Sequence, residues 1–211
     1  MIILAHRGYW KEPAEKNSVA AFDRSFSLGF GVETDIRDSG RELFIAHDMP
    51  TGQEQTVPAF LDQYQSYQLP MMLALNVKAD GLQAVMAKEL QGRGIESYFF
   101  FDMSLPDAIG YWKQGLHFYT RESEYEKDPY LYEAAAGVWL DEFNGHWIDE
   151  QVIGKHIRKG KKICIVSPEL HKRPYQAEWE HYRHLINKFG WEDLMLCTDL
   201  PEEAQNFFKH E

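Results

Sequence analysis

The sequence has few cysteines and lacks any long apolar run. Cys164 and Cys197 are its two cysteines, too few for a disulfide scaffold, and both lie in apolar segments where buried, reduced thiols are expected. No apolar run approaches the ~20 residues that a membrane-spanning helix requires. The apolar start of the chain is too short for a secretory signal and lacks its basic region. We therefore expect a cytoplasmic protein without membrane insertion.

Basic residues are also scarce. The chain has 22 lysines and arginines against 33 acidic residues, which gives a net charge of −11. This balance argues against nucleic acid as a partner, because sequence-independent binding to its phosphates depends on a positive surface. An acidic protein that acts on an anionic small molecule needs local positive charge at its site, from basic side chains or from a bound cation.

The order of apolar and amphipathic segments indicates the fold. The 211 residues are 44% hydrophobic with charge spread along the chain, so we expect one globular domain over residues 1–211. The expected strands are residues 2–5, 31–36, 71–77, 98–101, 116–119, 137–140, 162–166 and 194–198. The expected helices are residues 18–28, 58–67, 80–90, 106–114, 129–136, 150–159, 174–189 and 201–209. Eight strand-then-helix units predict a parallel sheet closed into a (β/α)8 barrel.

Two polar residues are expected to begin helices. Asn17 precedes the first amphipathic segment and Asp80 precedes the third. Short polar side chains at such positions accept hydrogen bonds from the free amide groups of the first helical turn. We therefore predict that both are N-caps.

The residues able to carry chemistry gather in the first quarter of the chain. His6 follows the first strand, Glu33 and Asp35 lie within the second, and His47 ends an extended segment after it. Residues two apart in a strand share a face, so Glu33 and Asp35 point the same way. Mg²⁺ and Ca²⁺ prefer carboxylate oxygens, and imidazoles beside such a cation can exchange protons with a reacting oxygen. The pattern predicts a cation site flanked by histidines.

Some of these charged residues also have plainer explanations. Carboxylates in an apolar strand need compensation, and besides a metal ion the partner could be Arg37 or Arg41. Arg7 offers a planar fork suited to two phosphate oxygens. Lys78, at the end of the third strand, either binds phosphate as a point charge or is solvated like most lysines.

Five short motifs occur in a fixed order along the chain. They are His6-Arg7-Gly8, Asn17-Ser18, Glu33-Thr34-Asp35, His47-Asp48 and Thr198-Asp199-Leu200-Pro201. As a set, they resemble the motifs of the glycerophosphodiester phosphodiesterases, whereas the chain between the fourth and fifth motifs shows little likeness. The resemblance implies a TIM barrel of the phospholipase C-like phosphodiesterase type. It also implies hydrolysis of a small-molecule glycerophosphodiester to glycerol 3-phosphate and an alcohol.

The resemblance further implies roles for individual residues. His6 and His47 are the expected acid and base, and the sequence does not indicate which is the base. Glu33 and Asp35 are expected ligands of Mg²⁺ or Ca²⁺. Relatives carry a glutamate as third ligand where this chain has Asn76. An amide oxygen can bind either cation but adds no negative charge.

The same resemblance assigns phosphate binding to Arg7 and Lys78. Lys16 is a departure, because relatives carry a glutamate before the asparagine of the second motif. Four acidic residues are candidates to replace the charge that Asn76 lacks, namely Asp141, Glu142, Glu169 and Asp199.

Two other functions stay open at this stage. One is a phospholipase D-like lyase on the same barrel that releases a cyclic phosphate. The other is a non-catalytic barrel that binds phosphate esters, although binding alone would not require both histidines. The sequence leaves the alcohol moiety of the substrate and the oligomeric state open.

Overall fold

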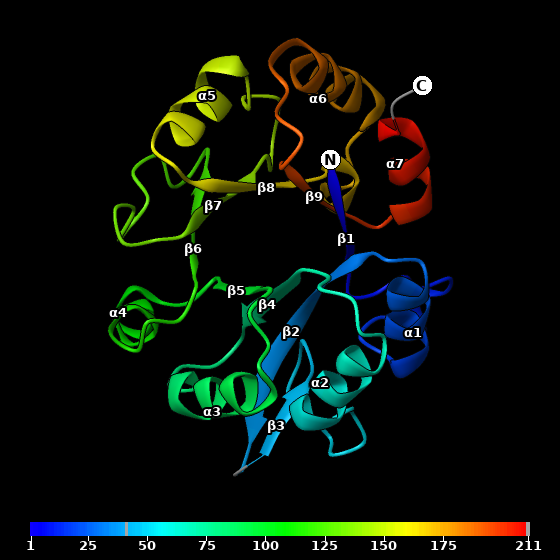
Figure 1. Cartoon of the computed structure of the whole chain (residues 1–211), viewed down its shortest axis with the longest axis vertical. Helices are drawn as coiled ribbons and strands as arrows, with labels where there is room; N and C mark the ends of the chain where they lie inside the picture. The colour runs from blue at the N-terminus through cyan, green and yellow to red at the C-terminus, as the bar shows by residue number, and fades with distance from the viewer. Residues whose placement is uncertain (41, 210–211) are drawn as a thin grey trace.

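A ring of parallel strands lies inside a ring of helices (Figure 1). The computed structural model describes residues 1–40 and 42–209. In that part of the chain the parallel strands are β1 (Ile2–His6), β2 (Gly31–Ser39), β4 (Leu73–Val77), β5 (Tyr98–Phe101), β6 (Tyr119–Ser123), β7 (Gly137–Asp141), β8 (Lys162–Val166) and β9 (Met195–Thr198). A further strand, β3 (Glu42–Ile45), pairs antiparallel with β2.

The helices follow the strands and cover the outside of the ring. Within residues 1–40 and 42–209 they are α1 (Val19–Ser27), α2 (Val57–Ser66), α3 (Gln83–Arg93), α4 (Leu105–Lys113), α5 (Glu150–Arg158), α6 (Gln176–Phe189) and α7 (Pro201–Phe208). Two short 3₁₀ helices, Pro13–Glu15 and Pro168–His171, lie in the loops after β1 and β8. No helix in the described chain is long and apolar enough to cross a membrane.

The sheet is almost closed. Its strands lie in the order β5-β4-β2-β1-β9-β8-β7-β6. The two end strands meet at a single parallel bridge between Phe100 and Phe118, where the Phe100 amide donates to the carbonyl of His117 at 2.9 Å. The described residues therefore form a nearly closed barrel of eight parallel strands, which confirms the expected fold.

One predicted helix is wrong. Residues 129–136 form turns, and Leu131 has a φ of +53°, which ends any right-handed helical run. A helix this short is marginal without strong packing. The segment's carbonyls instead bind side chains: Thr120 donates to Tyr130 at 2.8 Å, and Lys161 donates to Ala135 at 2.7 Å. The barrel thus has no helix between β6 and β7.

Strand β6 begins later than predicted. Tyr119 to Ser123 pair in parallel with Gly137 to Asp141, whereas the apolar pattern indicated residues 116–119. The paired segment contains Thr120, Arg121 and Glu122, so its polarity hid it from a search for apolar strands. The other predicted strands and helices lie close to the expected bounds.

The two predicted N-caps are also wrong. Ser18 caps α1, with its hydroxyl accepting from the Ala21 amide at 3.2 Å, while Asn17 has a φ of +58° and precedes the cap. Helix α3 begins three residues after Asp80, whose carboxylate accepts from Ser104 at 3.1 Å. In both cases the polar side chain has a partner on another element.

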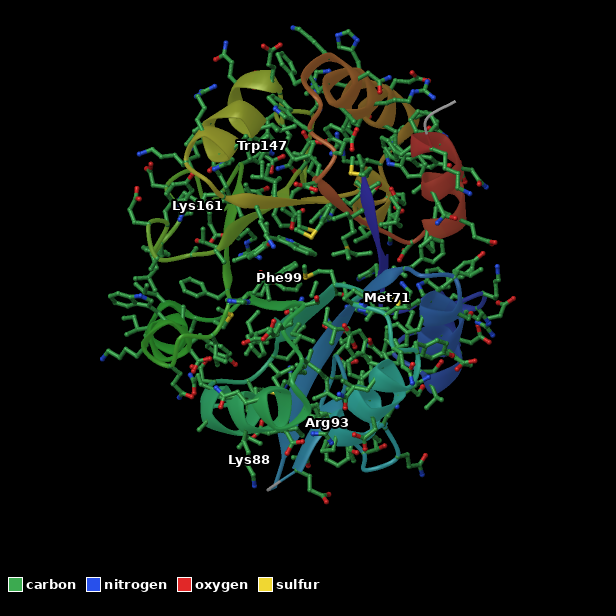
Figure 2. All side chains as sticks on the ribbon, in the orientation of Figure 1. Met71, Lys88, Arg93, Phe99, Trp147 and Lys161 are labelled. Atoms are coloured by element: carbon green, nitrogen blue, oxygen red, sulfur yellow. The ribbon has the colours of Figure 1, made fainter. Side chains whose placement is uncertain are left out.

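Stacked aromatic side chains fill the barrel interior. Phe99 stacks on Tyr119 with ring centroids 3.7 Å apart, and Phe101 stacks on Trp139 at 4.0 Å. Figure 2 shows Phe99 inside the ring of strands. The two cysteines, Cys164 and Cys197, pack in the same cluster as free, buried thiols, as expected. Burial raises the pKa of both thiols well above their ordinary range.

A buried polar network joins β6 to α5. His156 has no exposed surface, and its Nδ1 lies 2.8 Å from the Tyr132 hydroxyl while its Nε2 lies 3.2 Å from a Glu122 oxygen.

His156→Ala would leave a cavity and remove one partner of a buried carboxylate. We expect it to lower the free energy of unfolding by about 2–4 kcal/mol. Urea denaturation measures the loss, with the exposed His184→Ala as control; a loss below ~1 kcal/mol would contradict the network's role.

Candidate active site

The predicted site residues meet at the carboxyl end of four adjacent strands, β4, β2, β1 and β9. His6 pairs in register with Glu33, and Asp35 with Asn76. Neighbouring positions on parallel strands point to the same face. The sheet therefore brings an imidazole, two carboxylates and an amide together from three strands.

The turn after β1 shapes one side of this site. Arg7 has a φ of +56° and Gly8 a φ of +80°. A Cβ on Gly8 would lie 2.9 Å from the backbone of Ala21, so only glycine lets the turn pack against α1. The turn is what places Arg7 beside β2.

Asp35 is fully buried and has three polar neighbours. Arg7 Nε lies 3.0 Å from one carboxylate oxygen, Lys78 Nζ lies 3.3 Å from the other, and Asn17 Nδ2 donates to the carboxylate at 2.8 Å. The alternative pairing with Arg37 is wrong, because the guanidinium of Arg37 contacts the Met49 sulfur at 3.4 Å. Arg41 lies outside the described residues. The Lys78 ammonium group is directed to Asp35, and 20% of its side chain is exposed.

Glu33 is buried on the same face of β2. His6 Nε2 lies 3.9 Å from one of its oxygens, and the Arg7 backbone amide donates to the same oxygen at 3.3 Å. Burial, with repulsion from Asp35 next, raises the pKa of Glu33 to about 7, against the opposing charges of His6, Arg7 and Lys78. A cation at this place would favour the ionised carboxylate.

Asn76 is 7% exposed, and its side chain makes one hydrogen bond within the described residues. Its Nδ2 donates to Asp102 at 3.3 Å, while its buried Oδ1 has no hydrogen-bond partner among the described residues. A buried oxygen that accepts no hydrogen bond lowers the stability of the fold unless a bound ion or molecule interacts with it. Two carboxylates and a free amide oxygen are a donor set that fits Mg²⁺ or Ca²⁺.

Asp102 is a site residue that the sequence analysis missed. It follows β5 directly, with a φ of +64°. Arg121 Nη1 donates to its other carboxylate oxygen at 3.1 Å. The Asp102 side chain is 22% exposed. Desolvation by the protein around it raises the pKa of Asp102, although the nearby charges of Arg121 and Lys78 oppose the shift.

His6 is held by a carboxylate from the far end of the chain. Its Nδ1 lies 2.7 Å from Asp199 Oδ1. Burial acts to raise the pKa of Asp199. The hydrogen bond and charge of His6, together with the charge of Lys16, outweigh burial and lower that pKa below its ordinary value. Lys16 Nζ lies 3.8 Å from Asp199 Oδ2 and 4.4 Å from the centroid of the Trp10 ring. The lysine at this unusual position therefore faces the carboxylate that holds His6.

His47 lies in the segment that follows β3. The Ala46 amide donates to the Asp35 carbonyl at 3.0 Å, which ties this segment to β2. The His47 ring is exposed, and its Nδ1 lies 3.0 Å from Asp48. His47 and Arg7 line one open cleft of about 610 Å³. The structure thus places the second histidine on the wall of that cleft.

The four acidic residues considered as replacements for the missing charge do not hydrogen-bond to Asn76 in the described part of the chain. Each has another partner: Asp141 with His171 at 2.5 Å, Glu142 with the Trp147 amide at 2.7 Å, Glu169 with Thr198 at 2.5 Å, and Asp199 with His6.

Within the described residues, a second group of possible metal ligands is Glu142, His146 and Glu178. Arg173 already compensates these carboxylates: its Nη2 lies 2.9 Å from Glu178, and its Nη1 lies 3.9 Å from Glu142. Arg173 thus joins the loop after β8 to Glu142, in the loop after β7, and to Glu178, on α6.

Comparison with known proteins bears on the fold of the chain. No protein-family model matches the sequence, and no curated protein matches it. Among solved structures, a glycerophosphodiester phosphodiesterase from Agrobacterium tumefaciens superposes with a TM-score of 0.69 at 15% identity, over 99% of this chain and 98% of that chain. One from Parabacteroides distasonis gives a TM-score of 0.67 at 16% identity, over 98% of this chain and 85% of that one.

The chain shares the fold of these solved structures. A phosphodiesterase from Oleispira antarctica, solved with the product sn-glycerol-3-phosphate, shares this fold with a TM-score of 0.67 at 17% identity, over 98% of this chain and 96% of that one. Identities this low establish the fold, and the chemistry has to follow from the side chains. Two contacts in the candidate site were not predicted from the sequence. Asp102 accepts a hydrogen bond from Asn76, and Asn17 donates one to Asp35. The sequence indicates only that Asp102 is a polar residue after a strand and that Asn17 is a polar residue in a loop.

Proposed function

We propose that this protein is a divalent-metal-dependent phosphodiesterase that hydrolyses a glycerophosphodiester to glycerol 3-phosphate and an alcohol. The observation that carries the proposal is the pairing of His6 and Asp199 beside two buried carboxylates at the carboxyl end of the barrel. That end is where barrels of this class build their active sites. The product bound to the Oleispira antarctica protein of the same fold supports the substrate class.

Glu33, Asp35 and Asn76 would hold Mg²⁺ or Ca²⁺. The cation, when bound, supplies positive charge that stabilises the charged phosphoryl oxygens during displacement at phosphorus. The side chains of Arg7 and Lys78, which lie 3.0 Å and 3.3 Å from Asp35, add positive charge for the phosphate. This local charge lets a protein of net charge −11 accept an anionic substrate.

The histidines carry the protons. Asp199 occupies Nδ1 of His6, which fixes the ring and leaves Nε2 for proton transfer at the site. His47 stands on the wall of the open cleft beside Arg7. One imidazole takes the proton of the attacking oxygen, and the other gives a proton to the leaving alkoxide oxygen as its bond to phosphorus breaks. The net reaction consumes one water molecule.

His47→Ala tests the second half of this proton transfer. We expect kcat to fall by ~10²-fold or more, because one of the two proton-transfer groups is lost. Since the ring is exposed and accepts little packing, the melting temperature should stay close to that of the wild type. The exposed His184 on α6 provides a matched control, His184→Ala, with unchanged kcat. A wild-type rate in His47→Ala would remove His47 from the mechanism.

Product analysis separates this proposal from its rivals. We expect ³¹P NMR of the reaction to show glycerol 3-phosphate as the final product. A cyclic phosphate that accumulates without hydrolysis would indicate a lyase. Tight, metal-independent ligand binding by calorimetry, without turnover, would indicate a binding protein.

A further inference from the structure

Asn76 leaves the cation site one negative charge short. Glu33 and Asp35 are the two buried carboxylates on β2, and Asn76 pairs in register with Asp35 on the next strand. Ca²⁺ and Mg²⁺ affinity rises with the number of charged oxygen ligands. A site that works with two carboxylates would gain from a third negative charge nearby.

Asp102 lies where that charge is needed. Asn76 pairs in register with Phe101, the last residue of β5, and Asp102 follows directly after that strand. Its Oδ2 accepts a hydrogen bond from Asn76 Nδ2 at 3.3 Å. Asp102 has a φ of +64° at this point, a left-handed conformation that aspartate adopts more readily than most residues other than glycine.

The same hydrogen bond fixes which way the Asn76 amide points. A carboxylate accepts hydrogen bonds and does not donate them, so the amide must turn its NH₂ group toward Asp102. The oxygen then points away from Asp102, and this buried Oδ1 has no hydrogen-bond partner in the described residues. An acceptor so placed, on a side chain only 7% exposed and next in register to Asp35, is a ligand position.

We propose that Asp102 is a positioning residue for the cation site: it orients Asn76 through Nδ2, so that Oδ1 serves as the ligand, and it supplies the negative charge that the amide lacks. A hydrogen-bonded carboxylate also polarises the amide and makes its oxygen a stronger ligand. The inference rests on the proposed function, because it concerns the same cation.

The competing explanation is that Asp102 serves only Arg121. Arg121 Nη1 lies 3.1 Å from Asp102 Oδ1, and such a pair would stabilise the end of β5 without any effect on metal binding. The two explanations differ in what a neutral isostere does. Asp102→Asn can still accept from Arg121 through its amide oxygen, but it removes the charge beside Asn76.

The experiment is a charge exchange measured by direct metal binding. Isothermal titration with CaCl₂ and with MgCl₂, and the rise in melting temperature that each salt causes, are compared for the wild type, D102N and N76D/D102N. We expect D102N to weaken binding by about 10- to 100-fold. The double variant exchanges amide and carboxylate at the same two positions, and its affinity should return to within about threefold of the wild type. Asp193→Asn, an exposed aspartate at the other end of the barrel, is the control.

The results distinguish failure of the role proposed for Asp102 from failure of the proposed function. D102N that binds both metals as the wild type does, with only a lower melting temperature, would overturn the role of Asp102 and leave the proposed function standing. If D102N does not fold, the double variant decides alone: affinity near that of the wild type supports the proposal, and lost affinity overturns it. A wild-type protein that binds neither metal would instead contradict the metal dependence of the proposed function, and this inference with it.

Discussion

Replacing His6 with asparagine is expected to lower kcat by about 10²- to 10⁴-fold, the usual contribution of a general acid or base. The substitution is chosen for its geometry. An asparagine side chain can still donate a hydrogen bond to Asp199 in place of Nδ1, which lies 2.7 Å from that carboxylate, but it has no group in place of Nε2. The fall in kcat therefore reports the loss of proton transfer, because the hydrogen bond to Asp199 is kept.

Steady-state kinetics on the substrate identified for the wild type measures this loss. His184→Asn, the same change at an exposed position on α6, should leave kcat unchanged. A kcat for His6→Asn within about tenfold of the wild type would show that His6 transfers no proton in the rate-limiting step.

Asp35→Asn is expected to have a comparably large effect for a different reason. Asp35 is the buried carboxylate at which Arg7, Lys78 and Asn17 converge. Neutralising it removes a cation ligand and leaves two basic side chains without their shared partner. We expect activity to fall by about 10²-fold or more and the melting temperature to stop rising on addition of CaCl₂ or MgCl₂.

Thermal unfolding with and without each salt, alongside the rate assay, measures both effects. Asp193→Asn makes the same chemical change on the exposed surface and should keep the wild-type response to metal. An Asp35→Asn protein that is still stabilised by metal would place the cation away from β2.

The sequence predicted the arrangement wherever short-range periodicity was sufficient. The two-residue period of strands put Glu33 and Asp35 on one face of β2, and the apolar run before His6 put that residue at the end of β1. Both placements hold in the structure. The alternation of strands and helices predicted the barrel even though the helix expected at residues 129–136 does not form.

What the sequence could not provide depends on contacts between distant segments. The hydrogen bond of His6 joins residues 193 positions apart, and that of Asn76 joins residues 26 positions apart. No local pattern distinguishes Asp102 from other aspartates that follow strands. The motif that contains Asp199 does not reveal that this carboxylate pairs with His6. The same reason explains Asn17, which looks like a helix cap in sequence but bonds to Asp35 in space. It also explains β6, whose polar residues are compensated by partners on other elements, such as His156 for Glu122.

The most direct test of the whole account is release of glycerol 3-phosphate from a panel of glycerophosphodiesters, assayed with Mg²⁺, with Ca²⁺ and with a chelator. The account predicts release from at least one member of the panel, restored by one of the two metals and abolished by chelation. The member that reacts identifies the alcohol moiety. Folded protein that releases no glycerol 3-phosphate from any member, with either metal, would contradict the proposed activity.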